Sequence, residues 1–274
     1  MAGTGDRVPV GARIPVLLYH AVMEDPPAWI AGFTVRPKEF LAQLDAVRDS
    51  GRTPLTATGL TEALAGRAPL PERPVVITID DGFADLPGFT APALAARGLT
   101  GTAYLTTGAL GGADPRCLLP PAPMMKPGQL RELTDCGLEV GAHTVTHPQL
   151  DTLSAAAVRE ELRVPKAVLE DALGTPVPAF AYPHGYNSPA VRTLVREAGY
   201  SSAAAVRNAL SSTRDDPYRI ARLMLRSTDT TAELAFWLAG LGAPVAPYPD
   251  RLRTVGWRVY RRARATVTGP RFAG

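Results

Sequence analysis

Short apolar runs alternate along this chain with longer amphipathic segments, and this alternation restricts the fold more than any other feature of the sequence. Such alternation is typical of repeated βα units, in which parallel strands lie side by side and helices cover them. We therefore predict an α/β fold, a distorted (β/α)7-type barrel in a single domain, with an open doubly wound sheet as the alternative. No Gly-x-Gly-x-x-Gly follows a strand, which argues against a dinucleotide-binding sheet. The predicted strands are 14–19, 75–79, 101–106, 138–142, 179–182, 202–206 and 218–225.

Helices are predicted in most of the gaps between these strands. Apolar residues recur at helical spacing over 37–51 and again around Val191. The longest helix is predicted over 154–173, because a serine can cap its first turn and Gly174 can end it. Pro165 lies inside this segment and is expected to kink the helix.

Composition and charge divide the chain into three parts. We expect residues 1–13 to be a flexible N-terminus, 14–249 to form the barrel, and 250–274 to form a basic C-terminal helix or tail. The net charge is +3, and the last segment alone holds seven arginines and one aspartate. The rest of the chain is therefore mildly acidic, which argues against a nucleic-acid-binding protein. Without an apolar N-terminal segment, we expect a cytoplasmic protein, with its two cysteines reduced.

Histidines and aspartates follow the predicted strands at the points where those strands end. His20 follows the first strand, the pair Asp80-Asp81 follows the second, and His143 and His184 follow two later strands. In a β/α barrel the carboxyl ends of all strands meet on one face, which is where such barrels carry out chemistry. The sequence therefore predicts a single site that contains all of these side chains.

Two histidines and one carboxylate provide the donors for a metal site. His143 and His147 are four residues apart, so on one helical turn their imidazoles lie on the same face and can chelate one ion. The adjacent carboxylates of Asp80 and Asp81 repel each other when buried, and a cation relieves that repulsion. Adjacent residues of an extended chain point in opposite directions, so one aspartate can bind metal while the other faces a water. An Asp-Asp-Gly turn without a metal, or a site that only stabilises the fold, is the alternative.

This donor set predicts one divalent ion with open coordination positions. Zinc fits best, and cobalt, nickel or iron fit as well.

Three motifs in order give the chain a resemblance to polysaccharide deacetylases (carbohydrate esterase family 4, the NodB homology domain). Ile77-Thr-Ile-Asp-Asp-Gly-Phe83 resembles the family's Thr-Phe-Asp-Asp-Gly motif. His143 to Pro148 resembles His-(Ser/Thr)-x-x-(Ser/Thr)-His-Pro, and Phe180-Ala-Tyr-Pro-His-Gly185 resembles Phe-Ala-Tyr-Pro-(Tyr/Phe)-Gly. The resemblance implies a distorted barrel that hydrolyses N-acetyl, and sometimes O-acetyl, groups of glycans. It also implies that Asp80 is the general base and that Asp81, His143 and His147 bind the metal.

The chain departs from the family pattern at three places. The arginine that orients the base in many members is replaced by Ala181, and we expect Arg219 or Arg222 to take its place. The usual C-terminal histidine acid is missing, because no histidine follows His184. Leu17-Leu-Tyr-His20 resembles the Tyr-His motif of the poly-N-acetylglucosamine deacetylase-like subgroup, which implies that His20 is the general acid. His184 itself stands where an aromatic residue is usual.

The predicted substrate contacts come from the third motif and from loops. We expect Tyr182, Pro183 and His184 to contribute substrate contacts or a backbone N–H for the oxyanion, with Arg222 nearby. The proline-rich segment 114–127 is expected to cover the cleft. Two of its residues, Met124 and Met125, either contact substrate or fill the core. Trp29 is a candidate for stacking on a sugar ring.

The basic C-terminal segment is predicted to form a helix over 250–266. Leu252, Val255 and Val259 make one narrow apolar line among arginines. Two interpretations are open: an amphipathic helix that contacts an acidic membrane surface or partner, and a last helix packed on the barrel with solvated arginines. We favour the second, because the apolar line is narrow.

The sequence thus predicts a metal-dependent hydrolase that removes an acetyl group from an N-acetylated sugar or glycan by metal-activated water. An amidase for a small secondary metabolite or cyclic amide is the second hypothesis. A catalytically inactive carbohydrate-binding barrel is the third.

Overall fold

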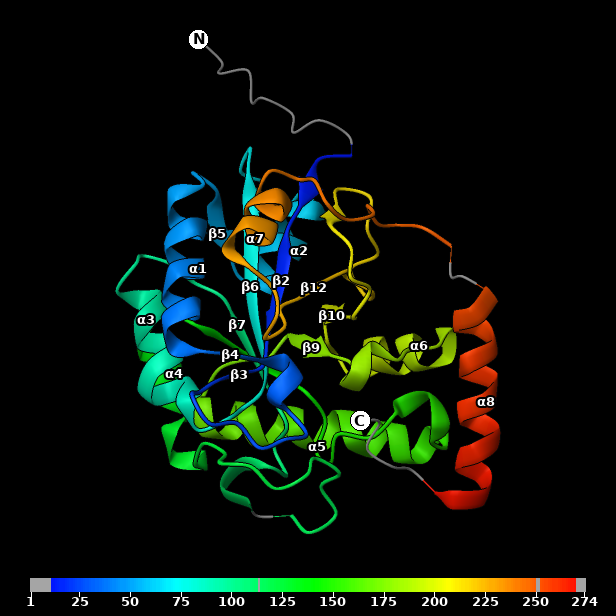
Figure 1. Ribbon diagram of the computed structural model, residues 1–274. Coiled ribbons are helices and arrows are strands. Elements are labelled where there is room, and N and C mark those ends of the chain that lie inside the picture. Colours follow the sequence, from blue (N-terminus) through cyan, green and yellow to red (C-terminus); the bar gives the residue numbers. More distant parts are fainter. Residues whose placement is uncertain (1–10, 113, 250–251, 270–274) are drawn as a thin grey trace.

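A strongly curled parallel sheet forms the centre of the molecule (Figure 1). The computed structural model describes residues 11–112, 114–249 and 252–269. Seven strands form a continuous path in the order β10-β9-β8-β7-β6-β2-β12, and β5 pairs with the start of β6. The sheet strands are β2 (Val16–Tyr19), β5 (Thr53–Leu55), β6 (Pro74–Asp81), β7 (Thr102–Leu105), β8 (Glu139–Ala142), β9 (Ala179–Ala181), β10 (Ser202–Ala204) and β12 (Leu223–Met224).

The two ends of this path meet, so the sheet closes into a distorted barrel. Leu223 and Met224 pair with β2, while Ile220, just before them, forms a parallel bridge with Ala204 of β10. Backbone hydrogen bonds from Ala205 N–H to the Ile220 carbonyl (2.8 Å) and from Ile220 N–H to the Ala203 carbonyl (3.0 Å) hold this closure. The predicted α/β barrel is confirmed. The predicted strand 218–225 is regular only over β12, because the same segment changes neighbours along its length.

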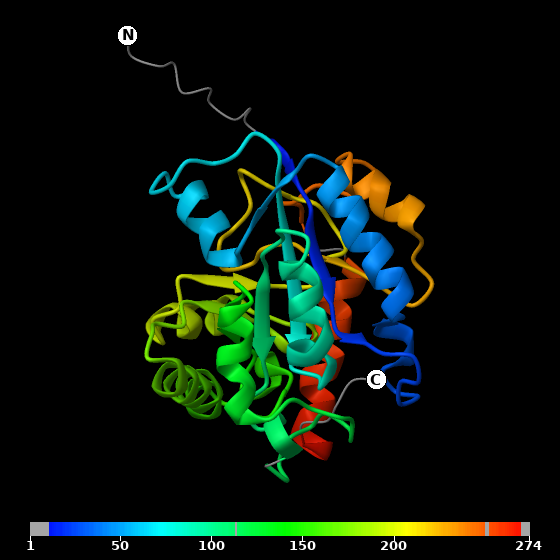
Figure 2. The ribbon, with the colours of Figure 1, turned by 90° about the vertical axis from the view of Figure 1, so that its left-hand side faces the viewer.

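Helices cover the outside of the sheet, as Figures 1 and 2 show. Serine side chains cap the first turns of α5 and α6, and Gly174 ends α5 in the left-handed conformation. Pro165 is accommodated within α5, which stays a single helix. The helices are α1 (Pro37–Asp49), α2 (Ala57–Leu64), α3 (Ala91–Ala95), α4 (Leu130–Asp135), α5 (Ala155–Leu173), α6 (Pro189–Glu197), α7 (Thr231–Leu238) and α8 (Leu252–Thr268).

Short elements that the apolar pattern does not predict attach the loops to the barrel. They are β1 (Arg13–Ile14), which pairs with β11 (Ser211–Ser212), and β3 (Ala21–Val22), which pairs with β4 (Thr34–Val35). Arg13, expected to be the end of a flexible segment, is held in β1 and donates a hydrogen bond to the Gly240 carbonyl (2.8 Å). Residues 1–10 of that expected segment lie outside the described residues. None of the described helices is long and apolar enough to cross a membrane.

The C-terminal helix α8 packs on the barrel through arginines and not through its apolar line. Arg261 is 3% exposed and forms a two-point ion pair with Asp151 (2.9 and 3.0 Å). Val255 and Val259, expected to face the barrel, are 42% and 62% exposed. The predicted orientation of the docked helix, with its apolar line on the barrel and its arginines in solvent, is therefore wrong. The buried ion pair between Arg261 and Asp151 holds the helix on the barrel, and the two valines stay exposed. The side chain of Leu252 lies outside the described residues.

Candidate active site

The carboxyl ends of four strands surround one pocket of about 200 Å³. His20 follows β2, Asp80 and Asp81 end β6, His143 follows β8, and His184 follows β9 by three residues. All of these residues and His147 line the pocket, so the structure brings together the four histidines and both aspartates that the sequence analysis grouped. The rest of the lining is apolar or aromatic: Trp29, Ile30, Phe33, Val206 and Met224.

Three buried donors converge as a metal site requires. One ligand atom each from Asp81, His143 and His147 lies within 4.8 Å of the others. Oδ1 of Asp81 is 3.3 Å from Nε2 of His147 and 3.6 Å from Nε2 of His143. Two imidazole nitrogens and one carboxylate oxygen form a donor set that suits zinc and similar ions and leaves coordination positions open. The residues present therefore fit a single divalent ion.

The two histidines of this set lie on a turn and not on a helix, which corrects the predicted geometry. Thr144 and His147 have positive φ angles, 70° and 59°. The backbone N–H of Val145 and of Thr146 both donate to the carboxylate of Glu161 on α5, at 2.8 and 3.0 Å, and the Thr146 hydroxyl donates to it as well (2.6 Å). The turn brings the two rings to a centroid separation of 5.0 Å, as a shared ion needs.

His143 is oriented by the strand next to it. Its Nδ1 lies 2.8 Å from the backbone carbonyl of Ala181, which directs Nε2 toward Asp81. A second hydrogen bond of this kind is usual for histidines that bind metal, because it fixes the tautomer and the ring. Burial lowers the pKa of His143 to about 4, although the charge of Asp80 opposes this shift, so the ring is neutral at pH 7 and can donate a lone pair.

Asp81 turns toward the same pocket as Asp80, so the expected opposite orientation of the two is wrong. Asp81 has a φ of 75°, which interrupts the alternation of the strand at its last residue. Both carboxylates consequently lie within 4 Å of Nε2 of His143. Burial opposes ionisation of Asp81, but the hydrogen bond and the electrostatic interaction with His147 outweigh it and lower the pKa of the carboxyl.

Arg222 holds Asp80 in place, which resolves the open choice between Arg219 and Arg222. Its Nη1 and Nη2 donate to the two carboxylate oxygens of Asp80 at 2.7 and 2.8 Å, and Nη1 also donates to the Thr78 hydroxyl (3.1 Å). Arg222 is completely buried and is not among the residues that line the pocket, and its guanidinium positions Asp80. Each carboxylate oxygen has a second lone pair, which remains for the pocket side.

His20 lines the pocket beside Phe33, and their ring centroids are 5.7 Å apart. Burial lowers the pKa of His20, and the negative charges of Asp81 and Asp80 oppose that shift.

The third motif contributes less to the pocket than predicted. Tyr182 is buried, its hydroxyl donates to the Tyr218 carbonyl (3.0 Å), and its backbone N–H donates to the Ala204 carbonyl (3.0 Å). That N–H is therefore not available for an oxyanion, and Pro183, which is buried, has none. His184 is the residue of this segment that lines the pocket, with its ring 4.7 Å from that of His147.

Gly185, the last residue of the third motif, lies where only a glycine fits. It has a φ of 73°, and a Cβ at this position would lie 2.4 Å from the backbone nitrogen of Val206. A larger residue would push the turn η6 (Pro183–Gly185) away from the segment after β10 and move His184 with it.

The rim of the pocket comes from the segment after β3 and not from the proline-rich segment. Within the described part of 114–127, no residue lines the pocket, so the expected cover is wrong. Met125 is fully buried in the main core, and Met124 packs with the apolar group that includes Phe83. The proline-rich segment instead supports Trp29, whose Nε1 donates to the Pro121 carbonyl (3.1 Å).

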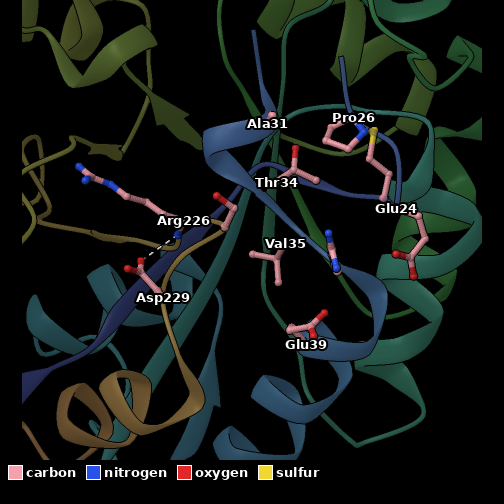
Figure 3. A pocket seen from close by; sticks show the side chains of 11 residues that line it. Glu24, Pro26, Ala31, Thr34, Val35, Glu39, Arg226 and Asp229 are labelled. Atoms are coloured by element: carbon pink, nitrogen blue, oxygen red, sulfur yellow. Dashed lines mark hydrogen bonds between the residues drawn. The ribbon is translucent and has the colours of Figure 1, made fainter. Parts of the chain in front are cut away.

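A separate pocket of about 340 Å³ lies beyond η1 (Ala31–Phe33) (Figure 3). Ala31 and Thr34 line it, while the neighbouring Ile30 and Phe33 line the pocket of the candidate metal site. Its acidic side chains include Glu24 and Glu39, and Figure 3 shows the Arg226 side chain pointing away from both. It contains none of the histidines, so it is not part of the candidate metal site.

Comparison with known proteins supports the same fold and motifs. A family model described as polysaccharide deacetylase matches residues 67–203, half of the chain. The Streptococcus pyogenes deacetylase PplD, solved in complex with acetate, is 23% identical, with a TM-score of 0.73 over 82% of this chain and 97% of PplD. IcaB from Ammonifex degensii is 24% identical, with a TM-score of 0.70 over 84% of this chain and 98% of IcaB. The Bacillus subtilis protein YxkH is 22% identical over 212 residues, 77% of this chain and 71% of YxkH. The matched range contains Asp80, Asp81 and the histidine pair, whereas His20 and Arg222 lie outside it.

Proposed function

The chain belongs to the polysaccharide deacetylase family, and on that basis we propose that it is a metal-dependent hydrolase that removes the acetyl group from an acetamido sugar. The observation that carries the proposal is the shared pocket. It joins the donors Asp81, His143 and His147 to a carboxylate, Asp80, that a buried arginine holds in place. A binding module would not need a base fixed in this way beside a metal site.

The residues divide the reaction between them. A divalent ion held by Asp81, His143 and His147 would acidify a bound water and polarise the acyl oxygen. Asp80 takes the proton of the attacking water, since its carboxylate borders the metal donors and Arg222 prevents it from rotating away. His20 gives a proton to the departing nitrogen, which could not leave as an amide anion.

An amidase for a small metabolite is the second candidate. The apolar and aromatic part of the lining, with Trp29, Phe33 and Met224, would accept a compact amide as well as a sugar ring. The same residues would carry out the hydrolysis, so substrate preference separates the two candidates.

Metal content and acetate release together test the proposal. We expect purified wild-type protein to hold one divalent ion per chain and to release acetate from N-acetylglucosamine or its oligomers. His143→Ala should lose both properties, because two donors do not retain the ion. Asp80→Asn should keep the ion and lose turnover, because Asp80 is the base and not a ligand.

Two results would contradict these assignments. An equal metal content in His143→Ala would remove the metal site, and metal loss in Asp80→Asn would make Asp80 a ligand. Release of acetate from small amides alone would favour the amidase.

A further inference from the structure

Arg261 is a buried arginine on a helix whose other described side chains are exposed or half-buried. It is 3% exposed, whereas its neighbours Val259 and Tyr260 are 62% and 53% exposed. Helix α8 lies at the edge of the molecule beside the ends of α5 and α6 (Figure 1), outside residues 67–203 that the family model matches. Because a buried guanidinium is unfavourable without polar partners, the contacts of Arg261 decide where this helix packs.

The guanidinium of Arg261 holds the segment that directly follows His147. Its Nη1 and Nη2 donate to the carboxylate of Asp151 at 3.0 and 2.9 Å, and Nη1 also donates to Oε1 of Gln149 (3.0 Å). Both partners are buried. Only Pro148 separates Gln149 from His147, and the fixed φ of proline leaves this link little freedom. The position of His147 is therefore coupled to the docking of α8.

The same guanidinium stacks on the segment that carries His184. Its Cζ lies 3.4 Å from the centroid of the Tyr186 ring, where a cation is attracted to the aromatic face. The Tyr186 ring in turn lies beside that of His184, with their centroids 5.8 Å apart. The His184 ring packs against that of His147 at 4.7 Å and an interplanar angle of 72°. A continuous row of contacts thus leads from α8 to the candidate metal site.

The two histidines that end this row have backbone conformations that need support. His147 and His184 have φ angles of 59° and 56°. Residues with a side chain adopt this left-handed conformation only where the surrounding structure holds them in it. Glu161 holds the backbone before His147, at Val145 and Thr146. Arg261 holds the segment after it.

We propose that Arg261 is a positioning residue for the metal site, which fixes His147 as a ligand and His184 as the adjoining wall of the pocket. The proposal rests on the proposed function, because it takes His147 to be a metal ligand. Arg261 is not among the residues that line the pocket, so it acts through Gln149 and Tyr186. Helix α8, far from the motifs in sequence, thereby completes the site.

Zinc affinity, measured by competition with a chelator, tests the proposal. Arg261→Gln should raise the Kd for zinc about tenfold or more, as the loss of groups that support metal ligands usually does. Arg261→Lys should recover part of the affinity, because an ammonium can still pair with Asp151 but cannot make the two-point contact or the planar stack. Arg264→Gln is the matched control: it removes one charge from the same helix, leaves the contacts of Arg261 in place and should keep the wild-type Kd.

A second variant decides the question if Arg261→Gln does not fold. Gln149→Met removes one hydrogen bond of Arg261 and leaves the ion pair with Asp151 that docks α8. It should raise the Kd for zinc in the same direction by a smaller factor. A role confined to docking α8 would lower the melting temperature of Arg261→Gln and leave the Kd of both variants at the wild-type value, which would overturn the proposal.

Hydrogen–deuterium exchange of the metal-free proteins separates this proposal from the proposed function. The amide of His147 donates to the Thr144 hydroxyl, and that of Gly185 donates to the Tyr182 carbonyl. Segments 144–147 and 184–187 should exchange faster in Arg261→Gln than in wild type or Arg264→Gln, with the exchange of β6 unchanged. This result supports the positioning role even if the protein binds no zinc and hydrolyses no amide. Exchange equal to wild type in both segments would overturn the positioning role and leave the hydrolase proposal intact.

Discussion

Two buried partner residues fix the orientation of two side chains in this site. His143 is held by the Ala181 carbonyl and Asp80 by Arg222, and neither partner reaches the pocket itself. Ala181 stands where many family members have the arginine that orients the base, and Arg222 of another strand segment pairs with Asp80 here. The same contact is therefore made from a different position in the chain.

His20 provides the sharpest prediction at this scale, because a general acid matters only for a poor leaving group. His20→Ala should lower kcat for an N-acetyl substrate by about 100- to 10,000-fold and leave hydrolysis of an activated aryl acetate nearly unchanged. His184→Ala is the control and should affect both substrates to the same extent, since His184 borders the pocket as a whole. Parallel losses on both substrates in His20→Ala would transfer the acid role to another group.

At the level of elements, helix α5 fixes the turn that carries the two histidines of the proposed metal site. Glu161 accepts three hydrogen bonds from Val145 and Thr146, which lie between His143 and His147. Left-handed conformations at Thr144 and His147 are unfavourable for residues with a side chain, so the turn depends on such support. A surface helix thus supports the backbone that sets the separation of His143 and His147.

Removal of this support should weaken metal binding without removing a ligand. Glu161→Ala is expected to reduce metal affinity about tenfold or more, as changes in the groups that support ligands usually do. The neighbouring Glu160 is exposed, and the Val145 and Thr146 bonds go to Glu161 and not to Glu160, so Glu160→Ala is the matched control. Competition with a chelator measures both affinities, and equal values for the two variants would show that the turn does not depend on α5.

For the molecule as a whole, the buried histidines of the site make the stability of the folded state depend on pH. Burial lowers the pKa of His20, His143 and His184, so these three rings bind fewer protons near pH 5 in the folded protein than in the unfolded chain. Stability supplied by a neutral buried histidine is present above its unfolded pKa of about 6.5 and is lost as pH falls.

The metal-free protein should therefore lose stability between about pH 6.5 and pH 4, the lower limit being the pKa of folded His143. Each such histidine contributes a slope of up to about 1.4 kcal/mol per pH unit to the free energy of unfolding. Denaturant unfolding of wild type and of His184→Phe is measured over this pH range. The two proteins differ only at position 184, so the difference between their slopes reports the titration of His184. The variant should show the smaller slope, and identical slopes would mean that His184 takes up a proton in the folded state as readily as in the unfolded chain.

The sequence by itself determined the fold class, the strand ends and the donor types. Periodicity identifies βα units, and parallel strands in a barrel must end on one face, so the residues after those strands had to meet. Tertiary structure alone decided what local pattern does not contain: that His143 and His147 lie on a turn, that Arg222 and not Arg219 pairs with Asp80, and that α8 docks through Arg261. Each of these depends on a contact between segments far apart in the chain, where a buried charge or an unusual backbone conformation outweighs the preference that the local sequence expresses.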